Sequence, residues 1–209
     1  MLSLLVVQVF AGVTLAGLVG GWVAGHLRPL PSAAGAPVVA ADRSTPWAVG
    51  AWVGASLLAA FWSVGVLLVP SYTYDWPGFP GFPGSSLVQV AGFVVSMGAG
   101  LLFFSAVRAL GKYMTPEIQV RKDHELIQRG PYRSIRHPVY TAILLGAAGS
   151  ATLYLSLPLA ALTVFLVAMA SLRARSEERL LSSPEAFGKE YADYVSRTGR
   201  FVPRIVSKR

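Results

Sequence analysis

Four long stretches without a charged side chain constrain the fold of this chain more than any other feature. Residues 2–25, 44–74, 77–107 and 138–172 contain no Lys, Arg, Asp or Glu. Each is long enough to hold the ~20 apolar residues that cross a lipid bilayer as a helix. Only 13% of all residues are charged, against about 25% in soluble domains. The sequence therefore predicts an all-α integral membrane protein.

We expect about five transmembrane helices. Three occupy residues 3–25, 46–69 and 86–110. The fourth uncharged stretch is too long for one crossing, and Ser156-Leu157-Pro158 interrupts it near its middle, as proline and turn residues do between helices. We therefore predict a helical hairpin there, whose second helix continues into the charged residues 173–179.

The first uncharged stretch has an alternative interpretation as a cleaved signal peptide, with SAAGA at 32–36 as the small-residue cleavage site. A signal peptide begins with a basic region and has a short apolar core. Residues 1–10 carry no basic side chain, and the apolar run is longer than such a core. We therefore expect a retained membrane helix.

A last, amphipathic helix is predicted near the C-terminus. Ser183-Pro184-Glu185 offers an N-cap, a first-turn proline and a first-turn acid, which together favour a helix start. Phe187, Tyr191, Tyr194 and Val195 then follow at helical spacing and form one apolar stripe. This helix is expected to dock on the protein or on the membrane surface.

The distribution of basic residues predicts the orientation of the chain. With five crossings, all 18 Lys and Arg fall on the side of the loops at 26–45 and 111–137 and of the C-terminal tail. The positive-inside rule then places the N-terminus outside and the C-terminus in the cytoplasm. Topology thus accounts for the net charge of +8, and we expect no nucleic-acid partner. The absence of cysteine excludes disulfides and thiolate catalysis.

The chain is predicted to have two regions, membrane helices in 1–110 and a region of different character in 111–209. Residues 112–137 carry nine formally charged side chains together with His124 and His137. A connection of this length is usually functional or disordered, and its aliphatic residues, such as Ile118 and Val120, argue against disorder. The segment is therefore a candidate functional site.

Polar groups from three segments should meet at the cytoplasmic membrane surface. The segments are residues 112–137, the start of the first hairpin helix and the charged end of the second. A hairpin brings the start of its first helix beside the end of its second, so Arg136, His137 and Tyr140 should lie near 173–178. Two simpler interpretations stay open. The arginines can serve only as topological anchors, and Glu177 and Glu178 can lie on a solvated helix face, paired with Arg173 and Arg175.

Other chemistries have little support in the sequence. His124-Glu125 begins like the zinc motif H-E-x-x-H, but Gln128 stands where the second histidine belongs, so we expect no metal. No G-x-S-x-G elbow of a serine hydrolase is present. The glycines at 17–21 lie inside a predicted membrane helix, which excludes a dinucleotide-binding loop.

The combined pattern resembles a known family. The stretches HELIQRGPYRSIRHPVY (124–140), RARSEERLL (173–181) and FGKEYADYVSRTGRFVPRI (187–205) are similar in order and spacing to the isoprenylcysteine carboxyl methyltransferase family and its bacterial and archaeal relatives. The resemblance covers about residues 110–205. It implies an S-adenosylmethionine site without a Rossmann fold, and a lipophilic or small methyl acceptor that enters from the membrane lipids.

The resemblance also implies which residues form the site. Those that line the cofactor in the family fall on Gln119, His124, Glu125, Leu126, Ile127, Tyr132, His137, Pro138, Val139, Tyr140 and either Glu177 or Glu178. The family's arginine on the last membrane helix falls on Arg175, which would be the catalytic, acceptor-orienting residue, with Arg136 as a second acceptor-binding residue.

These residue types suit the cofactor. Tyrosine rings can stack on adenine or attract the sulfonium, a glutamate can accept from ribose hydroxyls or the amine, and an arginine can hold a carboxylate through two parallel bonds. Methyl transfer needs positioning and exclusion of water rather than a protein nucleophile.

Alternative functions stay open at the level of sequence. Membrane sterol reductases contain a similar R-H-P-x-Y segment and use NADPH, although they are larger. A prenylcysteine carboxylate is the favoured acceptor, while a phospholipid amine or a thiol is an alternative. A non-enzymatic membrane scaffold is the third possibility.

Overall fold

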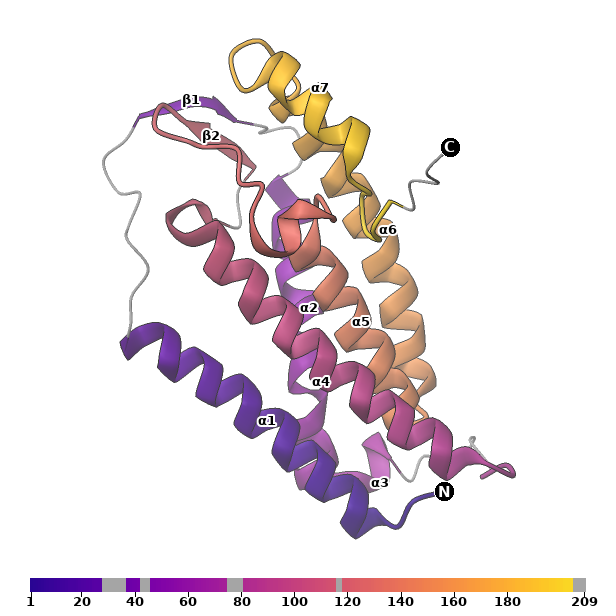
Figure 1. The fold of residues 1–209 in the computed structure, drawn as a ribbon. Helices are drawn as coiled ribbons and strands as arrows, with labels where there is room; N and C mark the ends of the chain where they lie inside the picture. The colour runs from indigo at the N-terminus through magenta and orange to yellow at the C-terminus, as the bar shows by residue number, and fades with distance from the viewer. Residues whose placement is uncertain (28–36, 42–45, 75–80, 116–117, 205–209) are drawn as a thin grey trace. The chain divides into compact units, whose positions relative to one another are not determined.

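The computed structural model describes residues 1–27, 37–41, 46–74, 81–115 and 118–204, which are mostly helical (Figure 1). The helices are α1 (Leu4–Leu27), α2 (Pro46–Leu68), α3 (Pro70–Thr73), α4 (Ser85–Leu110), α5 (Pro138–Leu153), α6 (Leu157–Leu181) and α7 (Gly188–Arg197). Two short strands are β1 (Val38–Ala41) and β2 (Gln119–Arg121). The segment 32–36, the cleavage site of the alternative signal-peptide interpretation, lies outside the described residues.

The apolar stretches form helices where the sequence predicts them. Among the described residues, Gly50–Leu68, Ser85–Tyr113 and Leu157–Leu181 are long and apolar enough to cross a membrane, and Leu4–Gly20 and Pro138–Leu153 are shorter apolar helices. Large apolar side chains such as Leu5, Leu87 and Val164 are more than 70% exposed, which suits a lipid-facing surface. The number of five crossings stays a prediction.

The chain forms two compact units, and each draws on three separate stretches. The first comprises Met1–Pro29, Gly54–Leu101 and Ala142–Val167, and the second comprises Leu30–Val53, Leu102–Thr141 and Ala168–Arg209. The division into regions 1–110 and 111–209 stays a prediction.

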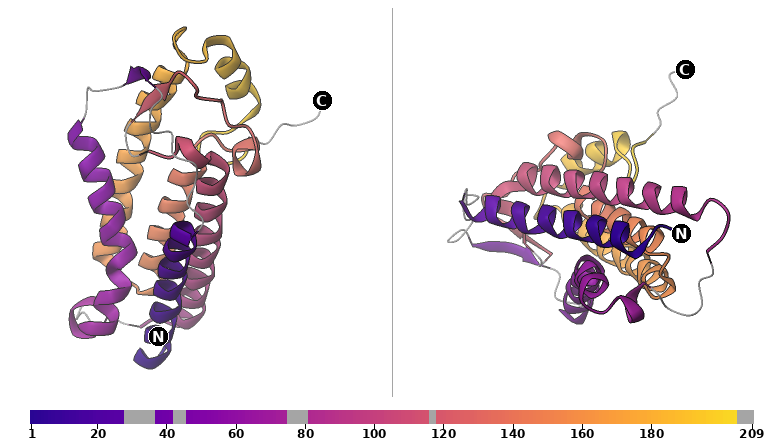
Figure 2. Two further views of the ribbon diagram at one scale, coloured as in Figure 1. Left: turned by 90° about the vertical axis from the view of Figure 1, so that its left-hand side faces the viewer. Right: turned by 90° about the horizontal axis from the view of Figure 1, so that it is seen from below.

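Helix packing dominates the first unit. Figure 2 shows α1 running alongside α4. The ring of Phe10 on α1 stacks on that of Phe93 on α4, with 4.2 Å between the ring centroids. Gly92 on α4 lies so close to α5 that a Cβ atom there would be 2.5 Å from the Leu153 backbone nitrogen. Glycine is required at this position because any side chain would collide with backbone.

The hairpin of α5 and α6 is confirmed. α5 begins at Pro138, where a missing backbone donor costs least, and α6 begins at Leu157 after a short turn in which Leu155 has a φ of 48°. α6 then continues without interruption to Leu181, as the sequence predicts. Arg173, Glu177 and Glu178 therefore lie on one continuous helix.

Two features of the second unit differ from prediction. β1 and β2 pair antiparallel, with Val38 opposite Arg121, whereas the sequence predicts no strand. The last helix begins at Gly188 rather than at Pro184, since Gly188 has a φ of 48°, a left-handed conformation that ends a continuous helix. Residues 183–187 form turns instead, in which Gly188 N donates to Ser183 O.

Candidate functional site

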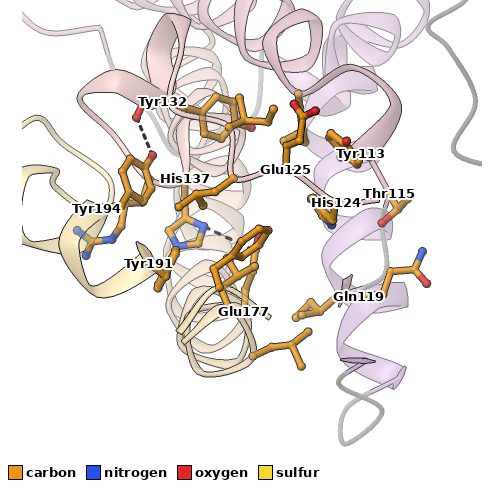
Figure 3. Close-up of a pocket in the computed structure, with 18 of the residues that line it drawn as sticks. Tyr113, Thr115, Gln119, His124, Glu125, Tyr132, His137, Glu177, Tyr191 and Tyr194 are labelled. Atoms are coloured by element: carbon orange, nitrogen blue, oxygen red, sulfur yellow. Dashed lines mark hydrogen bonds and ion pairs between the residues drawn. The ribbon is translucent and has the colours of Figure 1, made fainter. Parts of the chain in front are cut away.

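A pocket that is partly open to solvent lies in the second unit (Figure 3); the space it encloses, open solvent included, is about 770 Å³. Its walls come from four places: the end of α4 with the turn that follows it, residues 115–140, the C-terminal part of α6, and α7. All of them belong to the second compact unit. The three segments that the sequence predicts to converge are therefore brought together.

Most of the residues predicted to form the site line this pocket. They are Gln119, His124, Glu125, Leu126, Ile127, Tyr132, Arg136, His137, Tyr140 and Glu177. Pro138 and Val139 are buried at the start of α5 but do not line the pocket. Their backbone sets the direction in which His137 and Tyr140 project.

Arg175, which the family resemblance indicates as the acceptor-orienting residue, does not line this pocket. Its side chain is exposed, and the pocket is lined instead by the buried Arg173. The reason is helical geometry, since residues two apart on a helix point in different directions whereas residues four apart share a face. Arg173 shares a face with Glu177, and Arg175 does not.

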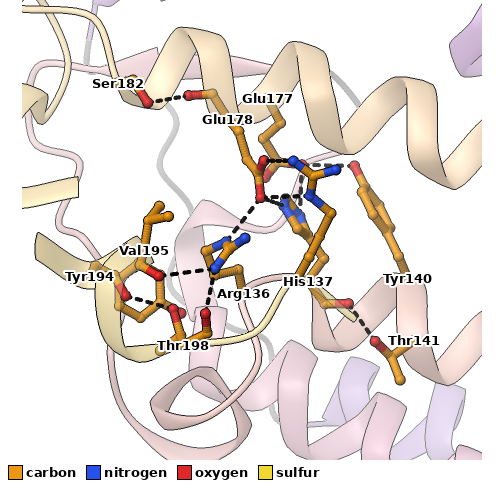
Figure 4. A network of polar contacts seen from close by, with 11 residues as sticks. Arg136, His137, Tyr140, Thr141, Glu177, Glu178, Ser182, Tyr194, Val195 and Thr198 are labelled. Atoms are coloured by element: carbon orange, nitrogen blue, oxygen red, sulfur yellow. Dashed lines mark hydrogen bonds and ion pairs between the residues drawn. The ribbon is translucent and has the colours of Figure 1, made fainter. Parts of the chain in front are cut away.

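His137 lies between the two glutamates of α6 (Figure 4). Its Nδ1 is 3.5 Å from Glu177 Oε2, and its Nε2 is 3.3 Å from Glu178 Oε1. Burial disfavours the charged imidazole, but hydrogen bonds to both carboxylates outweigh burial and raise the pKa of His137. A carboxylate acceptor at each ring nitrogen thus favours the protonated imidazole.

Glu177 and Glu178 have different surroundings. Glu177 lines the pocket and accepts a hydrogen bond of 2.9 Å from the Tyr140 hydroxyl. Glu178 does not line the pocket; it accepts from Arg136 Nε at 2.9 Å and from the guanidinium of Arg200. Of the two acids, Glu177 is therefore the one that faces the cavity.

Tyr140 is at the centre of an aromatic and cationic cluster. Its ring lies parallel to that of His137, with centroids 5.3 Å apart, and meets the edge of Trp52 at 5.2 Å. The guanidinium carbon of Arg173 is 5.9 Å from the ring centroid, within cation–π range. The cluster fixes the Tyr140 ring in the wall of the pocket.

A second aromatic wall is formed by His124. Its ring stacks on Tyr113 at 4.3 Å and meets the edge of Phe187 at 5.8 Å. The Tyr113 hydroxyl donates to Asp123 O at 2.6 Å, which holds the stack in place. Burial lowers the pKa of His124, so its imidazole is neutral near pH 7.

His124 Nδ1 and the Tyr191 hydroxyl are buried in the pocket wall and have no hydrogen-bond partner among the described residues. A buried polar group without a partner is costly, and both of these residues line the cavity. These atoms are where a polar ligand would gain most from binding. Burial also raises the pKa of Tyr191, so its hydroxyl stays protonated.

The sequence did not identify several lining residues, among them Tyr113, Arg173, Phe187, Tyr191 and Tyr194. For Phe187, Tyr191 and Tyr194, the sequence indicates only an apolar docking stripe. The Tyr194 hydroxyl donates to Tyr132 O at 2.6 Å, and this contact attaches α7 to the 130–133 turn. The four-residue spacing between Arg173 and Glu177 was the available signal for the arginine.

Comparison with known proteins gives a consistent result. Residues 90–183 match the model of the isoprenylcysteine carboxyl methyltransferase (ICMT) family. The chain is 30% identical, over 130 residues, to the probable protein-S-isoprenylcysteine O-methyltransferase of Oryza sativa subsp. indica, covering 61% of this chain and 67% of that protein. It is 26% identical to protein-S-isoprenylcysteine O-methyltransferase B of Arabidopsis thaliana, covering 71% and 77%.

Other similarities cover less of the matched protein. The cobalt-zinc-cadmium resistance protein CzcN of Cupriavidus metallidurans is 39% identical over 89 residues, which is 42% of this chain and 40% of that protein. A solved structure of the eukaryotic intramembrane Ras methyltransferase ICMT aligns with a TM-score of 0.52 and 22% identity, covering 78% of this chain and 54% of that one. At this identity, the structural match supports the fold alone.

The helices long enough to cross a membrane, the pocket built on the 124–140 segment, and the similarity to the rice and Arabidopsis proteins agree with one another. This integral, multi-pass membrane protein therefore belongs to the isoprenylcysteine carboxyl methyltransferase family.

Proposed function

We propose that the protein is a membrane methyltransferase that transfers a methyl group from S-adenosylmethionine to a carboxylate on a lipophilic acceptor, with a prenylcysteine carboxylate favoured. The observation that carries the proposal is the pocket in which Tyr132, His137, Tyr140 and Glu177 come together. Beside them lie His124 Nδ1 and the Tyr191 hydroxyl, which are buried and have no hydrogen-bond partner in the described part of the chain. The similar protein of rice is named a probable protein-S-isoprenylcysteine O-methyltransferase and that of Arabidopsis protein-S-isoprenylcysteine O-methyltransferase B, which supports the same reaction.

The residues present fit the chemical groups of S-adenosylmethionine. The aromatic wall of Tyr113, His124 and Phe187 would accept the adenine, and His124 Nδ1 offers the base a polar partner. The carboxylate of Glu177 would accept from the amine or the ribose hydroxyls. The ring of Tyr140 would attract the sulfonium by a cation–π interaction.

The bound cofactor would supply an activated methyl group for in-line displacement by an acceptor oxygen. The protein would then contribute orientation and exclusion of water. Arg173, rather than Arg175, would orient the acceptor carboxylate, because Arg173 is buried in the pocket. His137 would hold Glu177 through its Nδ1 proton.

The family resemblance indicates Arg136 as a second acceptor-binding residue, but its contacts favour a different role. Its Nε donates to Glu178 and its Nη1 donates to Thr198 O at 2.6 Å. The side chain, 9% exposed, is thus committed to the protein itself. We propose that Arg136 shapes the pocket rather than binds the acceptor.

The proposed orientation places the pocket on the cytoplasmic side, with the N-terminus outside. It rests on the positive-inside distribution of Lys and Arg. S-adenosylmethionine would then enter from the cytoplasm, and the acceptor from the membrane lipids.

Ligand-dependent thermal stabilisation of the purified protein in detergent tests the proposal, because a ligand that binds only the native state raises its stability. S-adenosylhomocysteine should raise the melting temperature, and NADPH should not. Stabilisation by NADPH alone would favour a reductase, whereas no response to either would favour a scaffold.

The acceptor is tested separately with cofactor labelled in the methyl group. An S-farnesylcysteine analogue with a free carboxylate should become labelled, and the corresponding carboxamide should not. Label in phospholipid or in a small thiol, with none in the carboxylate, would contradict the acceptor assignment while leaving methyl transfer intact.

A further inference from the structure

Arg200 makes a forked ion pair without lining the pocket. Its Nε is 3.1 Å from Glu178 Oε1, and its Nη2 donates to Glu178 Oε2. Contact with both carboxylate oxygens fixes the orientation of the acid, which a lysine cannot do in the same way. The Arg200 side chain is 38% exposed, against 14% for Glu178.

Glu178 connects Arg200 to the cavity through its contact with His137. The oxygen that accepts from Arg200 Nε is also 3.3 Å from His137 Nε2 and 2.9 Å from Arg136 Nε. His137 lines the pocket, whereas Glu178 and Arg200 do not. A continuous set of contacts therefore runs from a partly exposed arginine, through a half-buried acid, to a ring in the pocket wall.

The backbone around Arg200 is held independently of its side chain. Gly199 pairs with Ile135 in a parallel bridge, and Arg136 N donates to Gly199 O at 2.8 Å. His137 N donates to Arg200 O at 3.1 Å. Because these bonds use main-chain atoms, replacing the Arg200 side chain leaves the segment docked and removes only the contact with Glu178.

The charges facing His137 show what that contact does. Glu177 and Glu178 face it from α6, Arg136 precedes it, and Arg200 comes from the C-terminal segment. Without Arg200, the Glu178 carboxylate loses one of its two guanidinium partners and can rotate. The hydrogen bond to His137 Nε2 then weakens. The ring is held less firmly, so the contact of its Nδ1 with Glu177 weakens as well.

We propose that Arg200 is a positioning residue of the pocket, which orients Glu178 so that His137 is held against Glu177. This inference rests on the proposed function for its effect on cofactor binding, since Glu177 is the acid assigned to the cofactor. It assigns a role at the site to a residue outside the stretch that matches the family model, which ends at residue 183.

The affinity for S-adenosylhomocysteine, measured by calorimetry, tests the proposal. Arg200→Ala should weaken binding about tenfold, the size of one lost charge-assisted hydrogen bond, and Arg200→Lys should recover only part of the loss. Arg204→Ala is the matched control, because Arg204 is exposed on the same segment and donates to Ser196 O rather than to Glu178. It should bind like the parent protein.

A double-mutant cycle distinguishes positioning from general destabilisation. If Arg200 acts through Glu178, Arg200→Ala should cause little further loss in the Glu178→Gln background, because the two residues act as one unit. Additive losses would mean that Arg200 acts by another route, and would overturn the proposal.

A ligand-independent measurement separates this inference from the proposed function. The ¹⁵N signal of His137 Nε2 in the ligand-free protein, assigned with His137→Gln, should move in Arg200→Ala and stay in place in Arg204→Ala. An unmoved signal overturns the role of Arg200. Failure of the parent protein to bind S-adenosylhomocysteine would overturn the proposed function, while the ring signal still decides the role of Arg200.

Discussion

Arg173 and Glu177 lie one turn apart on the same face of α6, and both line the pocket. Arg175, between them in sequence, is exposed outside it. Helical phase therefore decides which arginine of this helix contacts the cavity. The proposed acceptor-binding role of Arg173 rests on this placement.

The two arginines make a matched test. Arg173→Gln should lower kcat/KM for the prenylcysteine acceptor by at least about 100-fold, because an acceptor that is not held in line reacts slowly. Arg175→Gln should stay within about twofold of the parent protein, as surface changes usually do. Labelled-methyl transfer under initial-rate conditions measures both. A larger loss in Arg175→Gln than in Arg173→Gln would restore Arg175 as the catalytic residue.

Tyr140→Phe removes the hydroxyl that donates to Glu177 Oε2 at 2.9 Å. We expect binding of S-adenosylhomocysteine to weaken about two- to tenfold, which corresponds to one hydrogen bond, because Glu177 is then less firmly held. Calorimetry gives the dissociation constant. Tyr72→Phe is the control, since Tyr72 is 73% exposed and belongs to the first unit; a similar loss in both variants would contradict the role of Tyr140.

Tyr191→Phe should separate stability from ligand affinity. The Tyr191 hydroxyl is buried without a partner among the described residues, so its removal should leave the free energy of unfolding of the ligand-free protein unchanged or slightly raised. Binding of S-adenosylhomocysteine should weaken, because the ligand loses a polar partner. Thermal unfolding with and without ligand checks both. A variant that is less stable without ligand but binds normally would show that the hydroxyl has a structural partner instead.

His137 predicts a specific dependence of stability on pH. Its pKa is raised above the ordinary value of 6.5, so the native state binds the proton more tightly than the unfolded state. The stabilisation is fully present below pH 6.5, declines as the pH rises above that value, and is lost once the pH passes the raised pKa. His124, whose pKa is lowered by burial, acts in the opposite sense below 6.5.

The contribution of His137 is therefore read as a difference between the parent protein and His137→Gln, in which His124 cancels. Melting temperatures in detergent from about pH 5 to about pH 9 span the transition. The advantage of the parent protein should shrink toward alkaline pH. An advantage that grows with rising pH would mean that His137 is neutral in the folded state.

Gly92→Ala tests the close contact of α4 with α5. The new Cβ would meet the Leu153 nitrogen at 2.5 Å and the Gly149 oxygen at 2.7 Å, and backbone atoms cannot move aside as a side chain does. We expect a loss of about 1–3 kcal/mol in the free energy of unfolding. Gly98→Ala, on the same helix with nothing within 4 Å, should be neutral or stabilising by up to about 1 kcal/mol. Equal effects would contradict the packing.

The sequence predicts the membrane helices well because uncharged runs of this length have few alternatives. The start at Pro138, the interruption before Leu157 and the extension of the second helix to Leu181 follow from single local signals. The pairing of β1 with β2 could not be predicted, because strands of four and three residues show no usable alternation. The late start of α7 depends on the left-handed conformation of Gly188. The sequence does not indicate it, because Ser183 is an equally plausible N-cap.

The candidate site shows the same division. Most motif residues in 119–140 line the pocket, and they are close together in sequence; Pro138 and Val139 are the exceptions. Tyr191 and Tyr194 fit equally well as a docking stripe, and only the path of α7 shows that they face the cavity. Which of Arg173 and Arg175 faces the cavity depends on how α6 is rotated about its axis. The apolar pattern of the hairpin does not determine that rotation.

The pairing of Ile135 with Gly199 has a consequence for biosynthesis. The ribosome makes the whole α5–α6 hairpin before Gly199 and Arg200, so the hairpin is presented for membrane insertion before the C-terminal partners of Arg136 and Glu178 exist. Those charged groups must stay hydrated until the last segment docks. A nascent chain therefore has no finished pocket until translation has passed this point.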